Sequence, residues 1–214
     1  MADTPSEDGG RKARLQSGDE QALAELFSLH RERLWRMVNF RLDRKLQGRV
    51  DPDDVLQEAY LAAAQRIGHF NGDSPMSPFV WLRMIVQQTL IDVHRRHLGA
   101  QMRDAGRETS VHGHDYSQTT FASLAAQLVG HLTSPSQAAQ RAEMLSQLEE
   151  ALAGMDPIDQ EVLALRHFEE LTNNEVAEVL RIQQKASSIR YIRALRRLKA
   201  ILSQTPGFLD EAQT

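Results

Sequence analysis

Apolar residues recur at intervals of three and four positions over long stretches of the chain, the spacing typical of helices with one buried face. From Asp19 to Leu46 this spacing predicts a single long helix, with Gly48 as its stop. The apolar positions that share its face are Leu23, Leu26, Phe27, Leu34, Val38 and Leu42.

A second helix is predicted to begin at the motif DPDD (51–54) and to run to about residue 67. Asp51 is a suitable N-cap, Pro52 suits the first helical position, and the next carboxylates lie near the positive end of the helix dipole. The string GHFNGDSPMSP holds two Gly and two Pro and therefore predicts a loop. A third helix is expected over about 79–98.

The second half of the chain follows after a break. Residues 100–133 mix Gly, His, Ser and Thr without sustained periodicity and predict a flexible linker, with at most a weak helix at 121–129. Beyond it, capping boxes at Ser134 and Thr172 and an Asp-Pro start at Asp156 predict further helices. Their expected spans are 134–153, 156–168, 172–180 and 184–202, and no strand pattern appears.

These elements predict an all-α protein made of two small helical domains. The 214 residues are many for one small bundle and comfortable for two, and 6% aromatic residues suits helices better than sheets. The expected organisation is a disordered tail at 1–18, a helical domain at 19–99, the flexible linker at 100–133, a second helical domain at 134–204 and a tail at 205–214.

Composition limits the location and the chemistry. No apolar run approaches the roughly 20 residues of a membrane span, and the opening segment lacks the apolar core of a secretory signal, so we expect a cytoplasmic protein. The absence of Cys excludes disulfides and thiolate nucleophiles. His94 and His97 near Asp92, and His112 with His114, do not match a metal motif. No glycine-rich phosphate loop or nucleophile motif occurs, so we expect no enzyme activity, cofactor or metal.

Charge is distributed unevenly along the second half. Residues 143–178 hold ten acidic residues and one Arg, whereas residues 181–199 hold seven basic residues and no acidic one. The net charge of −4 averages over these segments. This polarity predicts two surfaces with different partners.

The last two predicted helices have the proportions of a helix-turn-helix, whose second helix enters the major groove of DNA. On that helix three arginines share one face, while Ile192, Leu195, Leu198 and Leu202 lie broadly opposite and are expected to pack. Residues near its start would reach base edges. The candidate duplex-binding residues are Lys185, Ser187, Ser188, Arg190, Tyr191, Arg193 and Arg197. The alternative interpretation is a solvated basic helix face.

A different surface is predicted on the helix that begins at the DPDD motif. The acidic residues Asp51, Asp53, Asp54 and Glu58 gather there beside Gln57 and two apolar residues. Such a patch repels DNA. It either caps and solubilises the helix or binds a protein with a basic surface, because opposite potentials steer docking.

The loop before the third helix is a candidate site for single-stranded nucleic acid. Its aromatic and polar side chains could hold an unstacked base, and arginines of the next helix could follow the backbone. The candidate residues are Phe70, Asn71, Gly72, Asp73, Ser74, Arg83, Arg95 and Arg96. For the aromatic residues the favoured alternative is burial in the core.

From about Gly18 to Leu202, apart from the linker, the chain resembles the extracytoplasmic-function (ECF) sigma factors of the sigma-70 family. DPDDVLQEAYLAAAQRI is similar to the family's acidic segment, and the match assigns binding of the polymerase β′ clamp helices to Asp51, Asp53, Asp54, Gln57 and Glu58. FNGDSPMSPFVWLRMIVQQTLIDVHRR is similar to the segment that captures a flipped base of the -10 element and assists melting. LEEALAGMDPIDQEVLALRHFEELTNNEVAEVL resembles region 4, which leads into the helix that reads the -35 element.

The resemblance implies a sigma region 2 helical bundle followed by a region 4 helix-turn-helix. It implies bacterial RNA polymerase core (β′ clamp helices and β subunit) and promoter DNA as partners, with an anti-sigma factor or regulatory kinase as a further candidate. Gln88 stands where the family usually has Asn, and KASSIRYIRALRRL lacks the common recognition-turn residues, as in a divergent branch associated with planctomycete-like bacteria. The alternatives are a stand-alone helix-turn-helix regulator that never binds polymerase, and a regulated helical adaptor without a DNA role.

Overall fold

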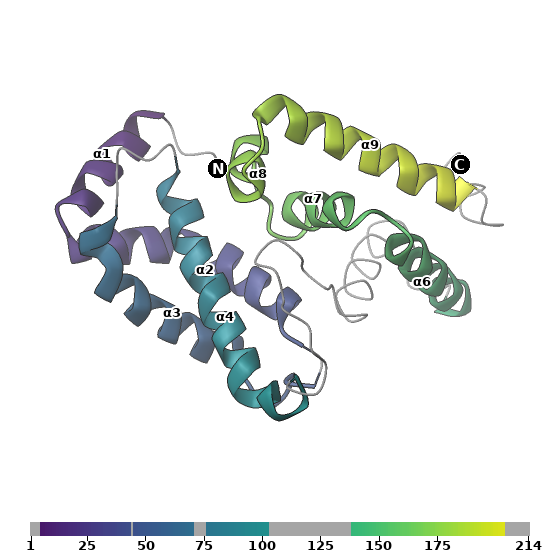
Figure 1. Ribbon diagram of the computed structural model, residues 1–214, viewed down its shortest axis with the longest axis horizontal. Helices are drawn as coiled ribbons and strands as arrows, with labels where there is room; N and C mark the ends of the chain where they lie inside the picture. The colour runs from purple at the N-terminus through teal and green to yellow at the C-terminus, as the bar shows by residue number, and fades with distance from the viewer. Residues whose placement is uncertain (1–4, 44, 71–75, 103–137, 204–214) are drawn as a thin grey trace. The chain divides into compact units, whose positions relative to one another are not determined.

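The computed structural model describes residues 5–43, 45–70, 76–102 and 138–203. The chain divides into two compact units, Met1–Arg107 and Glu108–Thr214. The described residues are predominantly helical and form no strand beyond one isolated bridge between Gln47 and Val50. The predicted all-α class is therefore confirmed (Figure 1).

The first unit contains α1 (Pro5–Gln16), α2 (Glu20–Arg41), α3 (Pro52–Arg66), the short 3-10 helix η1 (Ile67–His69) and α4 (Pro78–Met102). Helices α2, α3 and α4 each pack against the other two (Figure 1). Their shared core is aliphatic, as the spacing predicted. It includes Leu23, Leu26, Leu34, Val38, Val55, Leu56, Ala59, Val80, Leu82 and Val86.

Helix α2 begins where the sequence predicted and ends earlier. Asp19 caps its start, accepting the N–H groups of Gln21 and Ala22 at 2.9 and 3.1 Å. The predicted helix to Leu46 is wrong, because α2 ends at Arg41 and the chain turns. Leu46 is nevertheless buried, so the apolar spacing continued although the backbone had left the helix.

Residues 5–16 form α1, so the predicted disordered tail at 1–18 is wrong for this segment. The helix packs on α2, η1 and α4 and buries Leu15 completely. Arg14 anchors it, because its Nε lies 2.7 Å from Asp19 and its Nη1 lies 2.7 Å from Glu25. Hydrogen bonding to Arg14 lowers the pKa of both carboxyl groups. The helix is held by one buried leucine and one arginine, and a single apolar residue is too weak a pattern to predict a helix from the sequence.

The second unit contains α6 (Ala138–Ala153), α7 (Pro157–His167), α8 (Asn173–Leu180) and α9 (Gln184–Ser203). Helix α9 packs on α6, α7 and α8. The predicted starts of α7 and α8 are confirmed, with Asp156 accepting the N–H of Ile158 and Thr172 forming a capping box with Glu175. The buried apolar residues include Leu148, Leu152, Val162, Leu163, Leu165, Phe168, Leu171, Val176, Ala194 and Leu198.

The predicted linker is only partly covered by the structure. Residues 100–102 belong to α4, so this helix extends past its expected end. The rest of the linker, the weak helix expected at 121–129 and the capping box at Ser134 lie outside the described residues. Over the ranges that are described, no helix is long and apolar enough to span a bilayer.

Candidate protein-binding and nucleic-acid-binding surfaces

The acidic residues of α3 divide into those with a structural partner and those that face solvent. Asp51 accepts the N–H of Asp53 at 2.9 Å, as an N-cap. Asp53 pairs with Arg31 of α2 at 2.6 Å, and Glu58 pairs with Arg96 of α4 at 2.5 Å. Both of these pairs are largely exposed, so each contributes little to stability.

Asp54 and Gln57 are exposed, and within the described part of the chain neither side chain makes a hydrogen bond or ion pair. Each interpretation of the acidic patch, helix capping and partner binding, therefore applies to some of its residues. Asp51 caps the helix, whereas Asp54 and Gln57 are available to a partner.

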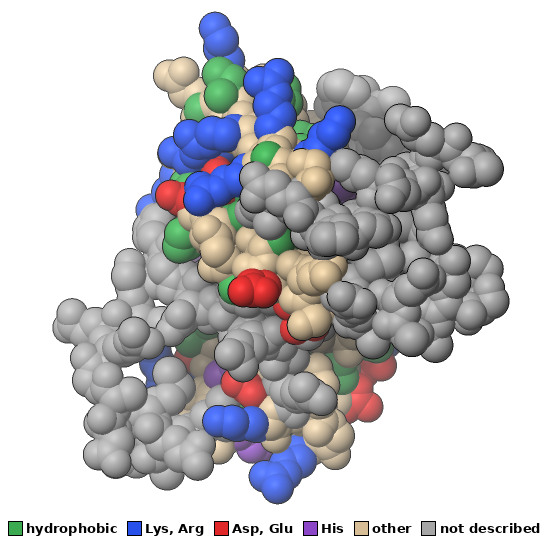
Figure 2. Space-filling view, turned by 90° about the vertical axis from the view of Figure 1, so that its right-hand side faces the viewer, with side chains coloured by type: hydrophobic (Ala, Val, Ile, Leu, Met, Phe, Trp, Pro, Cys, Tyr) green, Lys and Arg blue, Asp and Glu red, His purple; other side chains and the backbone are tan. Residues whose placement is uncertain are grey.

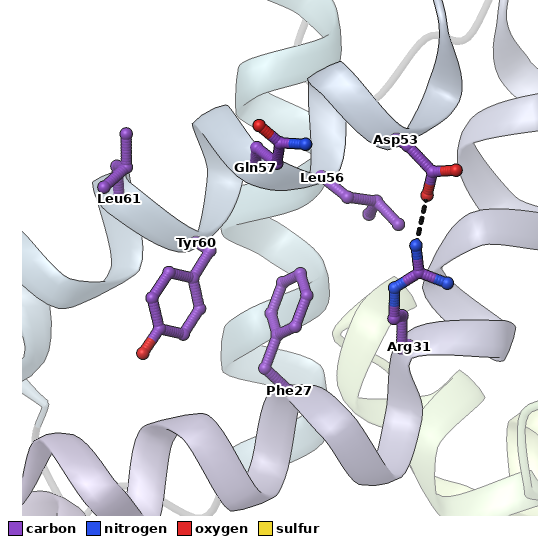
Figure 3. A pocket seen from close by; sticks show the side chains of 7 residues that line it. All are labelled: Phe27, Arg31, Asp53, Leu56, Gln57, Tyr60 and Leu61. Atoms are coloured by element: carbon purple, nitrogen blue, oxygen red, sulfur yellow. Dashed lines mark hydrogen bonds and ion pairs between the residues drawn. The ribbon is translucent and has the colours of Figure 1, made fainter.

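A groove of about 430 Å³ lies beside these residues, between α2 and α3 (Figure 3). The rings of Phe27 and Tyr60 meet edge to face in it, 5.1 Å apart. Arg31 and Asp53 lie at one end and Leu61, 61% exposed, lies at the other (Figure 3). The lining residues are Phe27, Arg31, Asp53, Leu56, Gln57, Tyr60 and Leu61. An apolar hollow edged by charge is typical of a protein-binding surface.

Phe27, Arg31, Tyr60 and Leu61 were missed as site residues in the sequence. Phe27 had been assigned to the buried face of the first helix, but it is only half-buried. Leu61 carried a usable signal, because it is a large apolar residue outside the buried stripe of Val55, Ala59 and Ala63. Such a leucine has no packing role within its own helix bundle.

The aromatic part of the predicted single-strand site is core. Phe70 is buried and meets Trp81 edge to face at 5.1 Å, so its ring is not a free stacking platform and the favoured alternative is confirmed. Phe79 is also buried, against His30. The predicted base-capturing residues Asn71, Gly72, Asp73 and Ser74 lie outside the described residues.

Among the arginines of α4, the assignment of Arg83 to a nucleic-acid backbone is wrong. Its side chain is 1% exposed and its Nη1 donates to Gln87 Oε1 at 3.1 Å, so it cannot reach a phosphate from its place in the core. Arg95 is exposed, with Asp92 at 3.9 Å. Arg96 is exposed too but holds Glu58, whose hydrogen bond raises the pKa of Arg96. The structure thus brings together two residues that the sequence assigned to different sites.

Helices α8 and α9 form the predicted helix-turn-helix. The turn between them begins at Arg181, which adopts the left-handed conformation with φ 53° and ψ 43°. Asn173 Nδ2 donates to the carbonyl of Gln184 at 3.1 Å and ties the start of α8 to the start of α9. This geometry presents the first turns of α9 at the surface.

The predicted orientation of α9 is wrong in part. Leu198 is buried as expected, but Ile192 and Leu195, also expected to pack, are 47% and 37% exposed, and Ala194 is buried beside Leu198 instead. The burial of Leu202 lies outside what the structure describes. Ser187 is also buried at 1% exposure, so its expected contact with a base is wrong. The small side chains of Ser187 and Ala194 let α9 lie close to the helices beneath it, and this rotates the isoleucines outward.

Three other predicted duplex-binding residues contact other parts of the second unit. Arg193 Nη2 lies 3.1 Å from Asp159 Oδ1, and Arg197 Nη2 donates to the carbonyl of Gly154 at 3.4 Å. The hydrogen bond to Asp159 raises the pKa of Arg193. The Tyr191 hydroxyl lies 3.3 Å from His167 Nε2.

The outward face of α9 is basic. Lys185, Arg196 and Lys199 are exposed on it, while Arg190 and Ser188 are half-buried. Figure 2 shows Lys and Arg side chains gathered over the part of this unit that α9 forms, with apolar side chains between them. Arg196 and Lys199 belonged to the basic run seen in the sequence but were not assigned to the site.

Of the two histidines near the end of α4, His94 has a structural role. His94 Nε2 accepts the backbone N–H of Asp43 at 3.2 Å, and burial lowers the pKa of His94. Nowhere in the described ranges do three or more His, Asp or Glu residues gather as metal ligands would. His112 and His114 lie outside these ranges.

Fold and surfaces together define an all-helical protein with a helix-turn-helix in its second unit and an acidic, grooved helix in its first. A family model described as ECF sigma factor matches residues 13–201. The chain therefore belongs to the ECF sigma factor family, and its role is that of an RNA polymerase sigma factor.

Individual relatives agree with this family. The chain is 26% identical to the RNA polymerase sigma factor YlaC of Bacillus subtilis (strain 168) over 152 residues, which is 71% of this chain and 77% of YlaC. The structure of CnrH in complex with the cytosolic domain of CnrY contains a chain with the same fold, with a TM-score of 0.51 and 23% identity. That match covers 92% of this chain and 98% of the other.

Proposed function

We propose that α3 and its groove bind the core polymerase, that the outward face of α9 binds duplex DNA of the -35 element, and that residues 71–74 with the exposed end of α4 contact the melted -10 strand. The observation that supports this division is the separation of surfaces. An acidic apolar groove lies in the first unit and a basic helix face lies in the second.

The polymerase surface combines two kinds of contact. An apolar side chain of the partner would enter the groove between Tyr60 and Leu61, and a basic side chain would meet Asp54. A buried apolar anchor beside complementary charge is the usual source of affinity and register at a protein interface. The clamp helices of the β′ subunit are the partner that the sequence resemblance implies, with the β subunit as a second contact.

The DNA surface is smaller than the sequence suggested. Arg83 and Ser187 are buried, and Arg193 and Arg197 are engaged within the second unit. The proposed phosphate contacts of α9 are therefore Lys185, Arg196 and Lys199, with Arg190 at the edge. On α4, Arg95 is exposed and remains the proposed contact to the backbone of the melted strand.

A sigma factor acts where the polymerase is, so we propose a cytoplasmic location and a role as an initiation factor without catalytic activity of its own. CnrH is bound to the cytosolic domain of a second protein in its structure, which supports a regulatory protein as a further partner of this chain.

Co-elution with bacterial core polymerase tests the proposed groove. Leu61→Glu is expected to weaken binding by about tenfold or more, because burying a leucine side chain is worth about 1.5–3 kcal/mol. Leu29→Glu is the matched control, since Leu29 is 53% exposed on α2 and lies outside the groove. Promoter-directed transcription with the same variants completes the measurement.

Equal binding of both variants would refute the groove as the docking site. A wild-type chain that ignores polymerase but binds palindromic duplex DNA tightly by itself would instead establish a stand-alone regulator.

A further inference from the structure

Two isoleucines stand out on the basic face of α9. Ile189 and Ile192 are 56% and 47% exposed, near the start of the second helix of the helix-turn-helix. Residues at this position of such a helix reach base edges in the major groove. Packing within the second unit does not use these side chains, because α9 turns Ser187, Ala194 and Leu198 inward instead.

Cations flank the isoleucines along the helix. Lys185 lies one turn before Ile189 and Arg196 lies one turn after Ile192, and both are exposed. The spacing of four, three and four residues places all of these side chains on one face. No acidic residue occurs between Arg181 and Lys199, so the charge around the apolar pair complements a polyanion.

The polar groups that the sequence suggested for base contacts are either buried or paired within the second unit. Ser187 is buried, and the Ser188 hydroxyl donates to the carbonyl of Gln184 in its own helix at 3.3 Å. Tyr191 is paired with His167. The isoleucines are therefore the side chains of this helix face best placed to meet base edges.

We propose that Ile189 and Ile192 contact the C5-methyl groups of thymines in the major groove, so that the chain recognises A·T pairs in the upstream promoter element by apolar contact. Thymine alone among the bases presents a methyl group in this groove, and apolar side chains bind it. The inference rests on the proposed function of α9 and adds a sequence preference to it.

Replacing thymine by uracil tests this contact, because the change removes the methyl group and keeps every hydrogen-bonding group. The full chain with bacterial core polymerase first selects duplexes from a library randomised upstream of a fixed -10 region. We expect thymine at the selected positions opposite α9. Each thymine-to-uracil change there is expected to weaken binding about fourfold, since a buried CH₂ group is worth about 0.8 kcal/mol.

Ile189→Ala and Ile192→Ala are expected to lose this sensitivity, each at its own position, while Leu29→Ala keeps it. Circular dichroism and thermal melting check that the variants fold, which the exposure of both isoleucines favours. The thymine contact alone would be overturned by either of two results. One is that uracil changes do not weaken binding of the wild-type chain, and the other is that they weaken binding of both isoleucine variants as much as that of the wild type. A chain that selects no duplex even with polymerase would overturn the proposed function together with it.

Discussion

His94 accepts a hydrogen bond from the backbone N–H of Asp43, at the point where α2 has already ended. An imidazole nitrogen accepts a hydrogen bond only when it carries no proton. Burial lowers the pKa of His94 below its usual 6.5, and the nearby Asp43 carboxylate opposes this only in part. The folded first unit therefore favours neutral His94.

We expect the free energy of unfolding to fall as the pH drops below about 6.5, because the unfolded chain then binds a proton that the folded chain excludes. The contribution is fully present above this pH and is lost as the pH falls through the lowered pKa. His94→Gln, whose amide oxygen can still accept from Asp43, is expected to reduce the pH dependence. Urea unfolding at about pH 7.5 and about pH 5 measures it. If the free energy of unfolding changes by the same amount between the two pH values in the variant and in the wild type, groups other than His94 cause the pH dependence.

Single residues also show where reasoning from the sequence reached its limit. Spacing placed Arg83 and Ser187 on the faces of their helices but could not say which face would pack. Arg83 has the long aliphatic stem that allows burial when its head finds a partner such as Gln87. Ser187 is small enough to lie under a helix contact. Such choices depend on the neighbouring helix, which no local pattern contains.

Helices α7 and α9 are joined by a pair in which one member is buried and the other exposed. Asp159 is 1% exposed and faces Arg193 at 3.1 Å, while the Arg193 side chain is 57% exposed. Within the described residues Arg193 is the only ion-pair partner of this carboxylate. The arginine is therefore expected to stabilise the helix-turn-helix rather than to bind phosphate.

Arg193→Ala is expected to lower the free energy of unfolding of the second unit, because it leaves a buried carboxylate without its partner. Arg196→Ala is the matched control, since Arg196 lies on the same helix and is exposed to solvent. It is expected to leave stability unchanged and to weaken DNA binding. Urea unfolding and a salt titration of promoter binding distinguish the two effects. The reverse result, with Arg193→Ala fully stable, would return this arginine to the DNA surface.

Helix boundaries were predictable where side chains cap the backbone. Asp51, Asp156 and Thr172 each accept the N–H groups that their positions promised, so α3, α7 and α8 begin as expected. The early end of α2 and the existence of α1 were not predictable in this way. Both involve contacts that no local pattern contains: His94 of α4 accepts the N–H of Asp43 just past the end of α2, and α1 packs on η1 and α4.

The chain as a whole consists of two units, each with its own buried apolar core. Separate polypeptides of residues 1–107 and 108–214 are expected to retain helical structure and to unfold cooperatively. The first is expected to co-elute with core polymerase as the whole chain does, and the second is not. Circular dichroism and gel filtration make the measurement. A first unit that folds but fails to bind would move the docking surface to the second.

At this scale the sequence predicted the class and the family, because charge and apolar spacing summed over long segments tolerate local errors. The net charge of −4 averages over a basic face on α9, which the uneven charge of the second half had indicated, and an acidic one on α3, which the DPDD motif had indicated. The divergent branch stays a prediction. The detailed site changed most, because it depends on the rotation of single helices.

Polymerase docking and strand capture are expected to be thermodynamically linked through the Glu58–Arg96 pair. A basic group of the polymerase that pairs with Glu58 would displace Arg96 from this carboxylate. The released Arg96 then joins Arg95 as a second cation on α4, available to a phosphate. Binding of polymerase would thus raise the affinity for the DNA strand, and in the free protein Glu58 neutralises Arg96.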